Sequence, residues 1–333
     1  MNKLSGIIMT LMLVIGASYA AFAQEQVKYE AKLIKKFYSM GTASINGTYY
    51  PLGNAISRLF GKKLKKMVTI AEPTAGSMAN VEYLRQKRID MALMQSDVAW
   101  MAYNGSHTYA GKPFKSLRVL AALYAEKIQI VVRADSGIKN LSDQKGKKIA
   151  VGEKESGSAA GAIQILEAAG LKPETDYEIV YERFTKSTES LLDGYVDAVY
   201  YVGAVPADGI TRLASKAQVR LIQIPMELVT KLITAFPYYS SENIAADSYR
   251  GQTETVNTLG FKALLTCTED MPTEDVITML SVIYSSPKLV SEQNEVLVEI
   301  NQADSLKGVD PQMLHTGASK FFSLYQEHNN TSK

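Results

Sequence analysis

Short apolar runs alternate with helical patterns along most of this sequence, and this alternation most limits the folds that the chain can adopt. Three times between residues 36 and 103, an apolar run predicts a strand, a turn of small polar residues follows, and apolar residues then recur at helical spacing. Parallel strands joined by crossover helices give this order, because helices then cover both faces of the sheet. The chain is therefore predicted to be an α/β protein.

The same order begins again after residue 117, which predicts a second lobe. Apolar runs at 117–124 and 127–132 are separated only by Ala125 and Glu126, and further strands and helices continue to residue 224. The tail has strand-like runs at 233–244 and 261–268, followed by helical patterns at 274–285, 288–301 and 311–327. We expect the chain to cross between the lobes near 124–127 and again near 224–236.

Two crossings would make a hinge, and a cleft between two lobes is a preferred place for a small ligand. The expected division places residues 28–125 plus 237–330 in lobe 1 and residues 126–236 in lobe 2. The sequence thus predicts a hinged two-lobe α/β fold with its ligand cleft between the lobes.

The first residues have the pattern of a secretory signal peptide. Lys3 gives a positive start, residues 7–15 are apolar, and Ala21-Phe22-Ala23 forms a cleavage site, so residues 1–23 are predicted to be removed after Ala23. The alternative is a membrane anchor, because residues 4–23 are nearly long enough to span a bilayer. Cys267 is the only cysteine, so no internal disulfide is possible, and export without disulfides favours a bacterial periplasm.

The charge balance and the reactive residues argue against several classes of function. Lys and Arg number 36 against 34 Asp and Glu, whereas nucleic-acid binding usually needs a strongly basic face. The three histidines lack metal-ligand spacing, so we predict no metal site. Ser158 is displaced from the spacing of a nucleophile elbow, and residues 152–158 lack the lysine of a phosphate-binding loop. We therefore predict a protein that is not an enzyme and uses no cofactor.

Four loops place small or hydroxyl residues between a predicted strand and a predicted helix, at 41–44, 74–77, 95–97 and 155–158. In open parallel sheets, ligands bind beyond the carboxyl ends of the strands, against helix N-termini. Those N-termini carry unpaired N–H groups, which suit a carboxylate. Any one such serine or glycine is more often an ordinary helix cap, so the prediction depends on four loops occurring together. None of them contains an arginine, so hydroxyl and backbone N–H groups would carry much of the charge of an anion. Arg133 and Arg183 are the alternative positive partners, although each is more often an exposed or hinge residue.

At these loops the sequence resembles the TAXI family of solute-binding subunits of tripartite (TRAP) transporters. The opening motif is Gly41-Thr42-Ala43-Ser44-Ile45-Asn46-Gly47-Thr48-Tyr49-Tyr50-Pro51-Leu52-Gly53. Further motifs follow in order: Thr74-Ala75-Gly76-Ser77, Gln95-Ser96-Asp97, Leu120-Ala121-Ala122-Leu123-Tyr124, Lys145-Gly146-Lys147 and Ser156-Gly157-Ser158. The resemblance extends from about residue 36 to residue 325. The first loop departs from the family pattern, because side chains at 43–46 occupy positions where relatives are richer in glycine.

The resemblance implies a type II periplasmic-binding fold that captures a small organic acid, either a glutamate-like amino acid or a dicarboxylate. It implies delivery of that ligand to a TRAP membrane permease, with transport driven by ions, and we expect a monomer that binds no nucleic acid. The expected ligand contacts are Thr42, Ala43, Ser44, Ser77, Gln95, Ser96, Tyr124, Ser156, Gly157, Ser158 and Tyr201. The alternatives are a module that presents bound ligand to a membrane receptor kinase, and a periplasmic enzyme.

Overall fold

The computed structural model describes residues 33–45, 47–65, 67–285 and 304–331. The predicted signal peptide, Asn46 of the first loop and the predicted helix at 288–301 lie outside these residues. Within the described parts of the chain, ten strands form one mixed sheet with the main order β2-β1-β3-β10-β4-β7-β5-β6. No described helix is both long enough and apolar enough to span a bilayer.

The first half of the sheet is a parallel three-stranded unit covered by helices, as the sequence predicted. Its strands are β1 (Phe37–Gly41), β2 (Val68–Glu72) and β3 (Met91–Gln95), and β1 pairs in parallel with both of the others. Its helices are α2 (Tyr49–Lys63), α3 (Ser77–Arg85) and α4 (Ser96–Asn104), followed by a 3₁₀ turn at His107–Tyr109. The apolar face of α2 is fully buried at Leu52, Ile56 and Phe60. Each of these helices therefore begins just after the carboxyl end of a strand.

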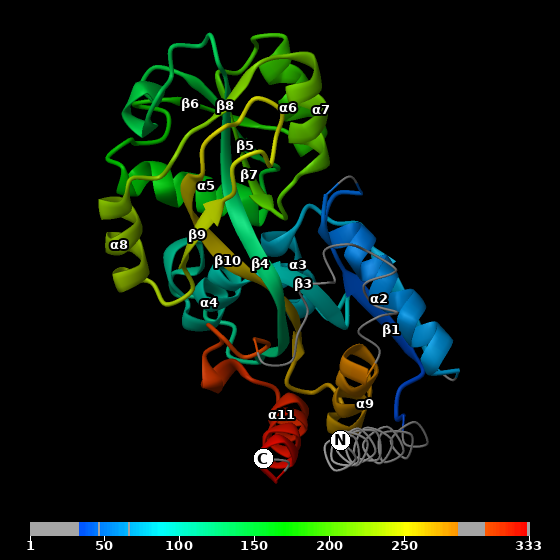
Figure 1. The fold of residues 1–333 in the computed structure, drawn as a ribbon. Coiled ribbons are helices and arrows are strands. Elements are labelled where there is room, and N and C mark those ends of the chain that lie inside the picture. The colour runs from blue at the N-terminus through cyan, green and yellow to red at the C-terminus, as the bar shows by residue number, and fades with distance from the viewer. Residues whose placement is uncertain (1–32, 46, 66, 286–303, 332–333) are drawn as a thin grey trace, which may run out of the picture.

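Two long strands run through both halves of the molecule (Figure 1). They are β4 (Leu117–Arg133) and β10 (Val256–Thr268), which pair antiparallel along residues 117–127 and 260–268. The sequence suggested two runs interrupted at Ala125 and Glu126, but the structure has one 17-residue strand. Glu126 does not break the strand, because it keeps its backbone pairing opposite Phe261.

The second half of the sheet extends from the other end of β4. Its strands are β5 (Lys148–Gly152), β6 (Glu178–Tyr181), β7 (Ala198–Gly203), β8 (Val219–Leu221) and β9 (Ser240–Ile244). Its helices are α5 (Gly157–Ala168), α6 (Phe184–Leu192), α7 (Asp208–Lys216) and α8 (Met226–Ala235), with a 3₁₀ turn at Leu141–Gln144. The strand expected from residue 233 begins only at Ser240, because Val229 and Leu232 pack at helical spacing in α8.

The division into lobes at residues 125/126 and 236/237 stays a prediction. Ile244, Tyr249 and Val256, which follow the second boundary, pack in one core with Val131 and Leu221. A boundary drawn by packing would therefore fall within β10 and not before β9.

The C-terminal elements return to the first half of the sheet. They are α9 (Thr273–Ser285), a 3₁₀ turn at Pro311–Met313, and α11 (Thr316–Thr331). Asp275, on α9, accepts hydrogen bonds from the backbone N–H groups of Ile34 (2.8 Å) and Lys35 (2.9 Å) and from the hydroxyl of Tyr38 (2.5 Å). This carboxylate, which is fully buried, joins the first strand to a helix some 240 residues later.

Replacing Asp275 with alanine should lower the free energy of unfolding by about 3 kcal/mol, because two N–H groups and one hydroxyl lose their shared acceptor. Urea unfolding followed by circular dichroism measures the change. Asp135→Ala is the control, since the side chain of Asp135 is 78% exposed, and it should change stability by no more than about 0.5 kcal/mol. Equal effects of the two substitutions would contradict the structural role of Asp275.

Candidate functional site

A small cavity lies where the loops after β1, β2 and β3 meet the N-terminus of α5. Its volume is about 80 Å³. The residues that line it come from both halves of the sheet and are Ala43, Gly47, Thr48, Tyr49, Ala75, Gly76, Ser77, Gln95, Glu126, Ser156, Gly157, Ser158, Tyr201 and Val202. The cleft predicted between two lobes thus has a counterpart in the structure, and below we call this cavity the cleft cavity.

The first two loops are held together by Thr42. Its backbone oxygen accepts hydrogen bonds from the hydroxyl of Thr74 (2.9 Å) and from the amide of Asn80 (2.7 Å), and its hydroxyl donates to the backbone oxygen of Glu72 (2.6 Å). Thr42 is fully buried and does not line the cleft cavity. Its position therefore gives it a supporting role, and the loop that it fixes presents Ala43 to the cavity.

The two halves of the molecule touch at the N-termini of α3 and α5. The N–H of Ala79 donates to the backbone oxygen of Glu155 (3.2 Å). A Cβ atom on Gly157 would lie 1.9 Å from the Oε1 atom of Gln95, so only glycine allows this approach. Gly76 has a φ of +119° and likewise faces Ser156. The structure is thus a closed arrangement in which backbone meets backbone across the cleft.

Three serine hydroxyls at the cavity accept hydrogen bonds from backbone N–H groups. Ser156 accepts from Ala159 (3.1 Å) and caps α5. Ser158 accepts from Val202 (3.2 Å), and Ser77 accepts from Gln95 (3.1 Å). Because a hydroxyl can accept and donate at once, each serine keeps its own proton for another acceptor. The three hydroxyls therefore form a set of donors around the cavity.

Glu126 is the charged site residue that the sequence analysis missed. It lies on β4, its exposed fraction is 2%, and its carboxylate accepts hydrogen bonds from the hydroxyls of Tyr49 (2.5 Å) and Tyr124 (3.3 Å). Burial is the main cause that raises the pKa of Glu126 to about 8; the hydrogen bonds from Tyr49 and Tyr124 oppose this rise, and the charge of Asp97 adds to it. Asp97 is itself fully buried, and burial raises its pKa to about 7.

The cavity lacks a compensating positive charge. None of its lining residues, all of which belong to the described chain, is lysine or arginine. The Oε1 atom of Gln95 is buried and has no hydrogen-bond partner among the described residues. The site therefore combines a buried carboxyl group, an unpartnered amide oxygen and a set of hydroxyl donors.

Tyr201 bridges the two halves from the other side of the cavity. Its hydroxyl lies 3.0 Å from the hydroxyl of Thr48, and its ring stacks on Phe184 with centroids 3.8 Å apart. Ser44 also bridges, because its hydroxyl forms a hydrogen bond with the carboxylate of Glu153, which follows β5. Burial raises the pKa of Glu153, while Arg183 and the bond to Ser44 oppose that shift.

The structure brings together seven of the eleven residues predicted to bind ligand, namely Ala43, Ser77, Gln95, Ser156, Gly157, Ser158 and Tyr201. Thr42, Ser44, Ser96 and Tyr124 do not line the cavity. Ser96 instead accepts a hydrogen bond from the N–H of Lys262 (3.0 Å) and so fixes β10, and Tyr124 donates a hydrogen bond to Glu126, which lines the cavity. Gly47, Thr48, Tyr49, Ala75, Gly76, Glu126 and Val202 are further lining residues. The sequence did contain a signal for Glu126, namely a single acidic residue within an apolar run.

Solved structures share this fold at low sequence identity. A protein from Bordetella bronchiseptica RB50 is 12% identical, with 89% of this chain and 99% of that chain covered and a TM-score of 0.56. The putative L-cystine ABC transporter from Listeria monocytogenes is 13% identical over 80% and 98% of the two chains, with a TM-score of 0.52. The periplasmic aliphatic sulphonate binding protein from Escherichia coli is 15% identical over 88% and 84%, with a TM-score of 0.48. The first two of these structures, whose TM-scores exceed 0.5, confirm the expected α/β fold.

A family model matches residues 40–325, a range that contains every residue lining the cleft cavity. It describes the NMT1-like family. Because the match covers most of the sequence, this chain belongs to the NMT1-like family.

Proposed function

We propose that the protein is a periplasmic solute-binding protein that captures a small amino acid in the cleft cavity and delivers it to a membrane permease. The observation that carries this proposal is the composition of the cavity, where hydroxyl donors and two helix N-termini face a buried carboxyl group. The fold supports it, since two-lobed binding proteins hold their ligands between the lobes. The resemblance to TAXI subunits supports a TRAP permease as the partner, with a monomer working in the periplasm and ions driving transport.

The donors would hold the carboxylate of the ligand. The N-termini of α3 and α5 meet at the cavity, and their first N–H groups and aligned dipoles favour a negative charge. Ser77 and Ser158 lie in the first turns of these helices and can add their hydroxyl protons. This arrangement can bind a carboxylate without an arginine.

Glu126 would hold the amino group of the ligand. A buried carboxylate without a positive partner is costly, and its raised pKa expresses that cost. An ammonium group that entered the cavity would supply the missing charge and donate a hydrogen bond to the carboxylate. A second ligand carboxylate in the same place would meet Glu126 only in its protonated form, because two adjacent carboxylates repel each other, and it would leave the ionised form of Glu126 without a positive partner. Of the two ligand classes expected from the sequence, the cavity therefore favours the amino acid over the dicarboxylate.

Capture would follow from closure of the two halves. The cavity is smaller than the usual 300–1,000 Å³ of ligand pockets, so the halves must separate to admit a solute. A ligand that touches Ser77 from one half and Ser158 from the other binds the closed state more tightly than the open state. It would therefore shift the population towards closure, and the closed surface is what a permease would recognise.

Ligand binding should be visible as thermal stabilisation without turnover. A bound amino acid at about 100 times its dissociation constant should stabilise the protein by about 2.7 kcal/mol. Differential scanning fluorimetry against amino acids, dicarboxylates and keto acids measures the shift, and mass spectrometry of the incubated ligand checks that it is unchanged. A panel in which no compound raises the melting temperature, or in which a ligand is consumed, would contradict the proposal.

Replacing Glu126 with glutamine should weaken amino-acid binding about 10- to 100-fold, because a charged hydrogen bond is lost while the shape is kept. Glu126 is mostly protonated below its folded pKa of about 8, so an ammonium ligand that binds the carboxylate should release up to about one proton at pH 7. Calorimetry in buffers of different ionisation enthalpy measures the released proton, which should be absent in the variant.

The same substitution distinguishes the two ligand classes, and it also changes how the stability of the protein depends on pH. If the ligand were a dicarboxylate, it would bind Glu126→Gln as well as or better than it binds the native protein, and that result would sink the amino-acid assignment. Without ligand, the carboxyl group of Glu126 favours the folded state less as pH rises from the unfolded pKa near 4.5 through about 8. Native stability should therefore fall across that window, and the variant should show a smaller fall.

Replacing Gly157 with valine should block closure while leaving the fold intact, because even the Cβ atom would overlap the amide of Gln95. We expect ligand affinity to fall at least about tenfold, a loss of roughly 1.4 kcal/mol. Small-angle X-ray scattering should show no ligand-induced decrease in the radius of gyration. Gly61→Val is the matched control, since a Cβ atom at Gly61 meets nothing within 4 Å. Native-like affinity and closure in Gly157→Val would refute the proposed mode of closure.

A further inference from the structure

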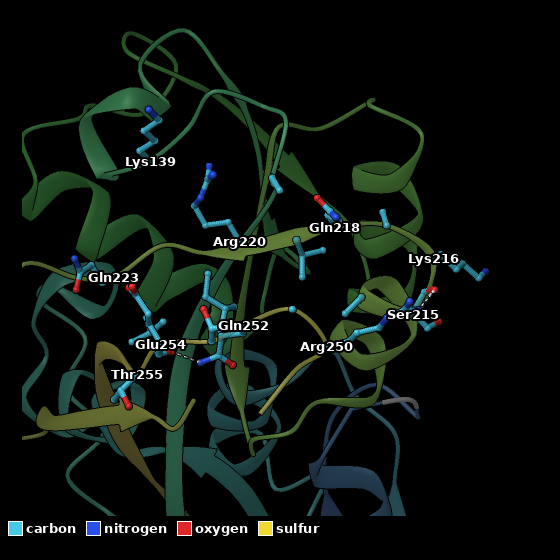
Figure 2. A pocket seen from close by; sticks show the side chains of 18 residues that line it. Lys139, Ser215, Lys216, Gln218, Arg220, Gln223, Arg250, Gln252, Glu254 and Thr255 are labelled. Carbon is cyan, nitrogen blue, oxygen red and sulfur yellow. Dashed lines mark hydrogen bonds between the residues drawn. The ribbon is translucent and has the colours of Figure 1, made fainter. Parts of the chain in front are cut away.

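A second, larger groove lies beside β8 and shares no lining residue with the cleft cavity. Its volume is about 710 Å³, and Figure 2 shows its side chains from close by. The groove is bounded by residues 214–223, which run from the end of α7 through β8, by residues 250–256, and by Ala134 and Lys139. Below we call it the β8 groove.

One edge of β8 is unpaired in the part of the chain that the structure describes, where β8 pairs only with β4. The N–H of Ile222 donates to the oxygen of Ile130 (2.8 Å), and the N–H of Ala134 donates to the oxygen of Gln218 (2.9 Å). Even-numbered residues of this segment therefore face β4. In an antiparallel pair the residues between them direct their N–H and C=O groups away from the partner, so those of Val219, Leu221 and Gln223 face the other side.

The β8 groove carries a local excess of positive charge. Lys139, Lys216, Arg220 and Arg250 line it, with Glu254 as the one acidic lining residue. None of the four cations forms an ion pair with a described residue. Arg220 is oriented by a hydrogen bond to the backbone oxygen of Ile138 (2.9 Å), and Arg250 by one to that of Ser215 (3.3 Å). The full chain has a net charge of only +2, so this concentration of cations is a property of the groove.

Gln252 adds a buried acceptor to the same groove. Its amide nitrogen donates to the backbone oxygens of Ala245 (2.9 Å) and Glu254 (2.8 Å), which fixes the orientation of the amide. Its Oε1 atom is buried and has no partner among the described residues. A buried acceptor held without a donor is costly, and an incoming N–H group would satisfy it.

We propose that the β8 groove binds an extended, acidic segment of a partner polypeptide, which pairs as an added strand with residues 219–223. The free edge of β8 would supply the backbone hydrogen bonds, as in other cases of strand addition to a sheet. Carboxylates spaced along the segment would meet Lys139, Lys216, Arg220 and Arg250. A small anion would leave the strand edge unpaired, so an extended peptide satisfies more of the groove. This binding is separate from the capture of solute in the cleft cavity.

The test uses the full protein and a fluorescein-labelled peptide of about eight alternating Glu and Val residues, which is longer than the segment 219–223 that it would pair with. Fluorescence anisotropy should show saturable binding that weakens as salt is raised. Three probes serve as controls: a Lys-Val peptide, a Glu-Val peptide N-methylated at alternate residues, and a single-stranded DNA of equal charge. Only the unmethylated Glu-Val peptide should bind, because it alone combines negative charge with a backbone that can pair as a strand.

Two charge-reversal variants locate the binding. Arg220→Glu with Arg250→Glu should reduce affinity at least about tenfold, and so should Lys139→Glu with Lys216→Glu, which changes only exposed side chains. Lys62→Glu with Lys63→Glu, at the exposed end of α2, is the matched control and should bind as the native protein does. Equal binding of the N-methylated peptide or of DNA would overturn the proposal. So would unchanged affinity in both groove variants, or no binding up to about 1 mM.

Discussion

The pairing of β4 with β10 is the constraint on which the rest of the structure depends. These two strands are the elements that belong to both halves of the sheet, and they pair from residue 117 to residue 127 of β4, with register shifts at Leu120 and Leu123. β3 and β9 attach to β10, while β7 and β8 attach to β4. Every other described strand is therefore placed, directly or through a neighbour, by this pair (Figure 1).

The cleft cavity follows from that arrangement. Parallel strands on each side end facing the other half, so the helices that follow them begin at the cleft and point their N-termini into it. Glu126 lies on β4 itself, opposite Phe261 of β10, and thus at the floor between the two sets of helices. The donors come from the two halves, whereas the buried carboxyl group comes from the strand that they share. A ligand held by both would contact all three parts of the molecule at once.

Local patterns predicted the parts of this architecture that depend on neighbouring residues. The strand-turn-helix order gave the fold class, and the Ser-Gly turns gave the positions of Ser77, Ser156 and Ser158 beside the cavity. Glu126 was missed because an acidic residue within an apolar run suggests a break between strands. Its place in a continuous strand depends on Phe261, which is 135 residues distant, and on the hydroxyl of Tyr49. Thr42, Ser96 and Tyr124 were expected to contact ligand, but each uses its polar group to position another residue, which no local pattern distinguishes.

If the cleft cavity binds a solute as proposed, the location of Glu126 also bears on how the preferred ligand can change. The serines and helix N-termini belong to the surfaces that close against each other, so altering them alters closure as well. The carboxyl group of Glu126 belongs to a strand whose backbone is already paired. A side chain of similar size at that position would therefore leave the contact between the two halves unchanged. Under the proposed function, a single substitution there would exchange one ligand charge for another, and the protein would acquire a different ligand without any change in the surfaces that meet across the cleft.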